Sequence, residues 1–395
     1  MPRTRSGEVA LGYGALSVRL SQHRPVKVCC VTGATGFVGG HVAKLLAEGG
    51  DRVRVTYRDR RRLERLHALD VDPVRAEMFD RGALRRAVRG CDLVFHTAGY
   101  VGSRPVDRVW RMNALTPRLV VEAAAAEGVP RVVHTSSVAA IGRAPHGEAA
   151  DETTVYRGGE FGLAYGDAKH EGEAEVLAAG ARLGVEVVVV NPAYVLGVPV
   201  DPYQPGETST RVVGNFMLGR LPAVVDGATN VVDVEDVARG HLLAAAKGKP
   251  GERYILGGYN LTWVELIDRL AVDSDVRRPL LVLPREVGAL ARLQGDLRLP
   301  GLIAPEAFAL MAQNWRASSR KAKRELGYRT RPLDATIKAT LEWYRDLITR
   351  GAIPRSGRSV LSVTAAGMRA ADRLGLIAGL RAAEAYLGRR LVAGT

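Results

Sequence analysis

The sequence predicts an α/β protein built on a doubly wound parallel sheet, followed by a smaller, mostly helical C-terminal region. Short runs of β-branched and apolar residues alternate with helical patterns between residues 26 and 192, and this alternation is typical of parallel βαβ units. The first run, residues 26–31, leads directly into a glycine-rich turn and then into a helix that begins near Phe37. A buried central strand followed by such a turn is a strong sign of this fold class.

The remaining elements follow in regular order. The first helix is expected to end at Gly49-Gly50, and further strands are expected over residues 52–57, 74–79, 93–99, 131–137 and 185–190. Asp80 is a predicted N-cap, and helices are expected over 81–89, 106–127 and 165–183. Beyond residue 192, prolines and glycines mark loops, and helices are expected near 210–219, 234–247, 262–272, 285–292, 304–315 and 333–350.

The glycine turn has the spacing of a dinucleotide-binding site. Gly33 permits the tight turn, Gly36 lets backbone N–H groups approach a pyrophosphate, and Gly39 allows the helix to pack on the strand. A glycine turn of purely structural use is the alternative. The intervening residues expected to contact the same cofactor are Thr35, Phe37 and Val38.

The end of the second strand indicates which nucleotide is bound. An NAD enzyme places Asp or Glu there to hold the ribose 2′-hydroxyl, but this chain has Tyr57 followed by Arg58. A guanidinium binds a 2′-phosphate in a bidentate fork, whereas a carboxylate repels it. NADP is therefore favoured over NAD, with Arg58 as the predicted phosphate ligand. A solvated basic turn is the alternative.

Three residues occur in the order that carbonyl reduction by a nicotinamide cofactor requires. Ser137 ends a predicted strand, and Tyr165 and Lys169 are four apart on the following helix, so they share a face. A tyrosine has a reference pKa of ~10, which an adjacent ammonium lowers toward neutrality. Ser137 is expected to hydrogen-bond the substrate oxygen, and Asn113 to hold a water near Lys169.

The composition excludes several other classes of protein. The formal charge of +14 comes from arginines spread along the chain, without a nucleic-acid-binding motif, which argues against nucleic acid as a partner. Cys29, Cys30 and Cys91 form no Cys-x-x-Cys pair and are expected to be buried thiols, so no metal site is expected. No apolar run reaches the ~18 residues of a membrane span, and a cytoplasmic location is expected.

The chain divides into four predicted parts. Residues 1–25 are expected to be a flexible leader, 26–192 a nucleotide-binding Rossmann domain, and 193–350 a substrate-binding region from which 230–247 returns to the first domain. Residues 351–395 form a basic tail with seven arginines from Arg355 onward and an apolar stripe at helical spacing. This tail is expected to dock on the protein itself, on a second subunit of a homodimer, or on an anionic membrane.

With these motifs, residues 26 to about 342 resemble an extended short-chain dehydrogenase/reductase. The similar branch contains dihydroflavonol reductases, 3β-hydroxysteroid dehydrogenases and hopanoid-associated sugar epimerases, and segments 134–142, 191–197, 230–240 and 253–257 also resemble it. Glu77 stands near the position of an adenine-contacting Asp in that family. The resemblance implies that the other cofactor contacts come from Gly33, Gly36, Gly39, Arg58, Met78, Thr97, Ala98, Gly99, Lys169 and Pro192.

The same resemblance leaves a choice of reactions. Related dehydratases carry Asp-Glu after the catalytic Ser or Thr, but Val138-Ala139 follows Ser137 here, which disfavours dehydration. The leading hypothesis is an NADPH-dependent reductase of a small ketone or aldehyde. The second is a nucleotide-sugar epimerase with retained NAD, in which Arg211 and Arg220 would bind a diphosphate. The third is a non-catalytic NADP-sensing or RNA-binding relative.

Overall fold

The structure is a computed structural model. It describes residues 25–353 except 103, 146, 160–163, 206–208, 222, 275, 277–280 and 286–309, together with residues 367, 370, 371, 373–375 and 379. The predicted leader up to residue 24, the helix expected near 285–292 and almost all of the predicted tail lie outside the described residues.

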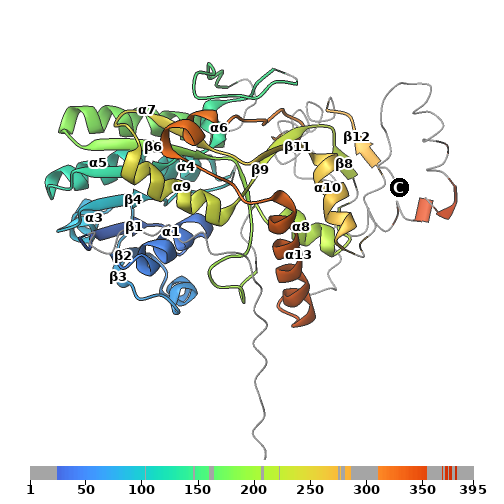
Figure 1. The fold of residues 1–395 in the computed structure, drawn as a ribbon, viewed down its shortest axis with the longest axis horizontal. Helices are drawn as coiled ribbons and strands as arrows, with labels where there is room; N and C mark the ends of the chain where they lie inside the picture. The colour runs from blue at the N-terminus through green and yellow to red at the C-terminus, as the bar shows by residue number, and fades with distance from the viewer. Residues whose placement is uncertain are drawn as a thin grey trace, which may run out of the picture.

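A seven-stranded parallel sheet forms the centre of the molecule (Figure 1). Its strands are, in spatial order, β10 (Arg253–Leu256), β6 (Glu186–Pro192), β5 (Arg131–Thr135), β4 (Leu93–His96), β1 (Val28–Thr32), β2 (Arg52–Tyr57) and β3 (Asp72–Arg75). Strand order reverses between β1 and β4, so the carboxyl ends of these strands border the crevice where doubly wound sheets bind ligands. The predicted fold class is confirmed.

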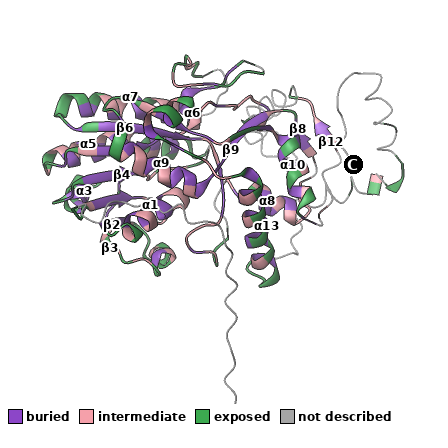
Figure 2. Ribbon diagram, in the orientation of Figure 1, coloured by how far each residue is buried: buried purple, intermediate pink, exposed green. Residues whose placement is uncertain are grey.

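Helices cover both faces of this sheet. Helices α1 (Phe37–Glu48) and α9 (Val234–Lys247) pack on one face, and the opposite face carries α3 (Arg81–Val88), α5 (Thr116–Ala126) and α7 (Ala164–Leu183). Neighbouring side chains of β1 enter opposite cores, Cys29 on the α1 side and Cys30 on the other, because side chains alternate along a strand. Buried residues are concentrated on the strands and the inward sides of the helices (Figure 2). All three cysteines are buried and free, as predicted.

Several boundaries in this part differ from the prediction: β4 and β5, for example, end at His96 and Thr135 and not at residues 99 and 137. The third strand was expected over residues 74–79, but β3 ends at Arg75. The last hydrogen bond between the two strands joins the N–H of Ala76 to the carbonyl of Tyr57, where the partner strand β2 ends. Beyond this point β3 has no strand to pair with. The helix expected over 106–127 is divided into α4 (Val106–Trp110), a π-helical turn (Arg111–Leu115) and α5.

The C-terminal region has an apolar core of its own. Its described helices are α8 (Arg211–Met217), α10 (Trp263–Val272) and α13 (Leu333–Thr349). The sequence analysis missed its short strands, which form a sheet of β11 (Tyr259–Thr262), β9 (Ala228–Asp233) and β7 (Tyr194–Leu196) and a pair of β12 (Leu281–Leu283) and β8 (Ala223–Val225). Four of these strands have only three or four residues, too few for a reliable period, whereas β9 has six.

Two segments of the range 193–350 belong to the main sheet. Strand β10 pairs with β6, and α9 packs against α1 on the face of the sheet. The sequence analysis assigned residues 230–247, but not β10, to the first domain; of that range α9 packs on the main sheet, whereas β9 pairs with β7 and β11. None of the helices that the structure describes has the length and apolarity needed to cross a bilayer.

Candidate active site

The turn between β1 and α1 has no room for side chains at two of its glycines. Gly33 has a φ of 74°, and a Cβ there would lie 2.6 Å from the backbone N and Cα of Ala98. A Cβ at Gly39 would overlap Oγ1 of Thr97. Helix α1 begins after Gly36 without a side-chain cap or an acidic residue in its first turn, so its leading N–H groups can bind an anion. This geometry fits the pyrophosphate of a dinucleotide.

Of the five arginines between residues 58 and 65, Arg58 and Arg65 are the candidates for binding a nucleotide phosphate. Arg58 is exposed, and the neighbouring Asp59 is the N-cap of α2 (Arg60–Leu63), because its carboxylate accepts the N–H of Arg61 at 3.0 Å. Arg65 reaches back to the glycine turn, where its Nη1 donates to the carbonyl of Thr35 at 3.3 Å. The sequence analysis missed Arg65.

Ser137 and Tyr165 are brought together beside the carboxyl end of β5. Ser137 is the N-cap of α6 (Val138–Ile141), and its Oγ accepts the N–H of Ala139 at 3.2 Å. Tyr165 lies in the first turn of α7, where burial raises its pKa and a hydrogen bond with Ser137 opposes the rise. The net shift is upward, so the lowering toward neutrality that the sequence analysis expected from Lys169 is not found. A hydrogen bond that lowers the pKa of a phenol stabilises the phenolate.

Lys169 lies one turn after Tyr165 and is buried. Its Nζ donates to the carbonyl of Thr135 at 3.1 Å. Burial lowers the pKa of Lys169 to about 8, and the negative charge of Glu173 opposes this shift. A Cβ at Gly99 would lie 3.2 Å from Nζ, so the ammonium also borders the segment predicted to contact the cofactor.

Asn113 lies in the π-helical turn and is buried. Its Oδ1 accepts the N–H of Tyr100 at 3.0 Å, and its Nδ2 donates to the carbonyl of Tyr100 at 2.9 Å. A Cβ at Gly99 would lie 3.1 Å from the same Oδ1. Asn113 and Lys169 therefore both border Gly99, and Asn113 holds the backbone of this segment in addition to its predicted role with water.

The other predicted site residues are dispersed. Met78 is buried in the apolar core and Glu77 is exposed beside it. Pro192 ends β6, and Arg211 begins α8 near Tyr344 in the C-terminal region. Within the part of the chain that the structure describes, no group of three or more His, Cys, Asp or Glu side chains forms a candidate metal site.

Comparison with known proteins decides the family. A model described as the NAD dependent epimerase/dehydratase family matches residues 29–257. The chain belongs to this family. Its membership in the epimerase/dehydratase family confirms the predicted resemblance to extended short-chain dehydrogenase/reductases.

Several relatives in the epimerase/dehydratase family carry different names. A Synechocystis protein named as a dihydroflavonol 4-reductase is 32% identical over 332 residues, covering 80% of this chain and 94% of the relative. Sterol demethylase protein B of Methylococcus capsulatus is also 32% identical, over 325 residues, covering 80% of this chain and 98% of the relative. Cinnamoyl-CoA reductase 1 of Oryza sativa is 34% identical over 257 residues, covering 62% and 75%.

A solved structure shows the same fold. The nucleoside-diphosphate-sugar epimerase from Pseudomonas aeruginosa superposes with a TM-score of 0.69 at 28% identity, covering 82% of this chain and 98% of the epimerase. Together, the family and its named members identify the chain as an NAD(P)-dependent enzyme, as predicted. The non-catalytic alternative is therefore set aside.

Proposed function

We propose that this enzyme reduces a ketone or aldehyde group of a small molecule to an alcohol, with NADPH as its cofactor. The observation that carries the proposal is the hydrogen bond between Ser137 and Tyr165, with Lys169 one turn away on the same helix. Two relatives named as reductases, one for a dihydroflavonol and one for a cinnamoyl-CoA, support reduction over epimerisation.

Each of the three side chains has a distinct task in this proposal. The nicotinamide supplies the hydride when it is bound. Ser137 donates a hydrogen bond to the substrate oxygen as negative charge develops there. Tyr165 gives its proton to that oxygen, and the ammonium of Lys169 stabilises the phenolate that remains.

The preference for NADPH rests on the residues after β2. Tyr57 occupies the position where an NAD enzyme has a carboxylate, and Asp59 is already engaged as the N-cap of α2. Arg58 and Arg65 both carry guanidinium groups suited to a 2′-phosphate. Contacts of Arg65 with Thr35 bring its charge beside the turn proposed to hold the pyrophosphate.

A nucleotide-sugar epimerase is the second candidate, favoured by the likeness to the P. aeruginosa structure. Such an enzyme retains its cofactor while the keto intermediate rotates within the active site. A reductase exchanges its cofactor in every cycle, so the two candidates differ in whether external NADPH is consumed.

The test is an assay of NADPH oxidation by purified protein with dihydroflavonols, cinnamaldehyde and simple ketones. The proposal expects loss of NADPH absorbance with at least one carbonyl compound and none with the Tyr165→Phe variant. Protein that carries tightly bound NAD and leaves external NADPH unchanged would overturn the proposal in favour of the epimerase.

A further inference from the structure

A buried carboxylate lies one helical turn beyond Lys169. Glu173 is on the same face of α7 as Lys169, and only 5% of its side chain is exposed. A buried, ionised carboxylate is costly unless opposite charge and hydrogen bonds compensate it. The proposed reaction gives Glu173 no task, so its retention in the core needs an explanation.

Both oxygens of Glu173 are satisfied. Oε2 accepts from Nη1 of Arg253 at 3.2 Å, and Oε1 accepts from Nδ2 of Asn191. The same Nδ2 donates to the carbonyl of Ser137 at 3.0 Å. Glu173 is thus connected to the backbone of one proposed catalytic residue and lies a helical turn from another.

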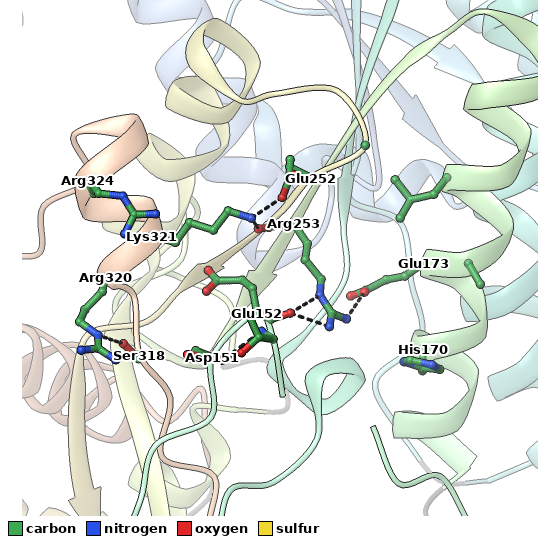
Figure 3. A pocket seen from close by; sticks show the side chains of 14 residues that line it. Asp151, Glu152, His170, Glu173, Glu252, Arg253, Ser318, Arg320, Lys321 and Arg324 are labelled. Atoms are coloured by element: carbon green, nitrogen blue, oxygen red, sulfur yellow. Dashed lines mark hydrogen bonds and ion pairs between the residues drawn. The ribbon is translucent and has the colours of Figure 1, made fainter. Parts of the chain in front are cut away.

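Arg253 comes from β10, the strand at the edge of the main sheet. Its Nη2 and Nε donate to the backbone carbonyl of Glu152 at 2.8 and 3.2 Å, which fixes the guanidinium between Glu152 and Glu173 (Figure 3). The guanidinium lines a cavity of about 710 Å³ together with Lys321 and Arg324. The ion pair therefore lies between the core and an open cavity.

The other titratable groups near Lys169 provide no compensating negative charge. His96 and His134, on β4 and β5, have pKa values far below the usual range because they are buried, and His241 of α9 has a pKa of about 4 for the same reason. These imidazoles are neutral at pH 7, and burial keeps Tyr165 protonated. Glu173 is the negative group that acts on Lys169.

We infer that the Glu173–Arg253 ion pair is a positioning device that keeps Lys169 protonated in its buried location. Arg253 pairs with the carboxylate of Glu173 and orients it, and the negative charge of Glu173 acts on the ammonium of Lys169. The inference deepens the proposed reduction and rests on it for its catalytic meaning. Neither residue is proposed to touch the substrate, so both are positioning residues.

The charge of Lys169 can be measured without any substrate. The chain has eight lysines, so ¹³Cε-lysine labelling gives a tractable NMR titration, with Lys169→Arg identifying the resonance. In Glu173→Gln we expect the midpoint of the Lys169 titration to move to lower pH by about 1 to 2 units. This shift corresponds to the loss of a Coulomb attraction across ~6 Å at an effective dielectric near 20. Arg253→Gln should move it in the same direction, because the carboxylate of Glu173 then loses the ion-pair partner that orients it.

The control is Glu171→Gln, which removes an exposed carboxylate from the same helix. Its Lys169 midpoint should stay unchanged, and Glu173→Asp, which keeps the charge, should restore most of the shift. NADPH oxidation by Glu173→Gln should fall roughly tenfold at pH 7.5 and recover as the pH is lowered.

The outcomes separate the two proposals. An unchanged Lys169 midpoint in folded Glu173→Gln overturns the ion-pair inference and leaves the proposed reduction untouched. A shifted Lys169 midpoint supports the electrostatic coupling, whether or not wild-type protein oxidises NADPH. Failure of wild-type protein to oxidise NADPH would count against the proposed function alone. Loss of activity at every pH in Glu173→Gln, without a shifted midpoint, would also contradict the inference.

Discussion

The side chains of Ser137 and Tyr165 share a hydrogen bond, although a short helix and a long loop separate them in the chain. The N–H of Ala139 donates to Ser137 Oγ and so holds that oxygen in place. Burial raises the pKa of Tyr165, and the bond from Ser137 opposes that effect. Two groups suited to polarise and protonate one substrate oxygen therefore face the same point.

Removal of the Tyr165 hydroxyl should abolish reduction while cofactor binding persists. We expect Tyr165→Phe to lower kcat about 10²- to 10⁴-fold, the usual contribution of a positioned acid. Ser137→Ala should also lower kcat, with little change in the Kd for NADPH. Stopped-flow NADPH oxidation and fluorescence titration measure the two quantities. A Tyr165→Phe variant with wild-type kcat would contradict the proposed roles.

Arg65 should contribute to cofactor choice together with Arg58. Because a charge-assisted hydrogen bond contributes ~1.5–3 kcal/mol, Arg65→Gln is expected to weaken NADPH binding about 10- to 100-fold and NADH binding far less. Calorimetric titration with both nucleotides checks this difference. Arg52→Gln, at the opposite end of β2, is the matched control. Equal weakening of both nucleotides in Arg65→Gln would argue against a phosphate contact.

The sequence was sufficient wherever the signal was local. The glycine turn, the caps and the Tyr165-Lys169 helix follow from spacing alone, and β2 and α9 have the predicted bounds. Contacts between residues far apart in the chain could not be predicted from local spacing. The partner of Glu173 lies 80 residues further along the chain, in a strand whose place at the sheet edge depends on pairing with β6. The reach of Arg65 to Thr35 likewise depends on how the chain folds back after β2.

Gly172 permits α7 to pack against the π-helical turn that carries Asn113. A Cβ at Gly172 would overlap the carbonyl oxygen of Asn113. Since both groups are backbone-fixed, Gly172→Ala should cost about 2–3 kcal/mol of unfolding free energy and displace Asn113 from Tyr100. Urea denaturation measures the loss, with Glu171→Ala as the exposed control. Unchanged stability in Gly172→Ala would show that the two segments separate easily.

His134 should make the protein sensitive to acid. Neither of its ring nitrogens has a hydrogen-bond partner among the described residues, and burial lowers its pKa well below 6.5. The unfolded chain binds a proton at this site below pH ~6.5 whereas the folded chain does not, so stability falls as the pH drops below that value.

Replacement of the imidazole by an apolar ring tests this directly. His134→Phe should reduce the pH dependence of unfolding free energy between pH 6 and pH 5 by about 1.4 kcal/mol per pH unit. Urea denaturation at several pH values provides the slope. The exposed His67 supplies the control variant His67→Gln, which should keep the wild-type slope. An unaltered slope in His134→Phe would mean that His134 is protonated in the folded protein.

The central claim is that hydride passes from an exchangeable nicotinamide to a substrate carbonyl beside Tyr165. Incubation with NADPH deuterated at the nicotinamide C4 and a reactive carbonyl compound, followed by mass spectrometry of the product, tests it most directly. The account predicts an alcohol with one deuterium on the former carbonyl carbon and an equal amount of NADP⁺ formed. An isomerised product without deuterium, or no consumption of the external cofactor, would contradict it.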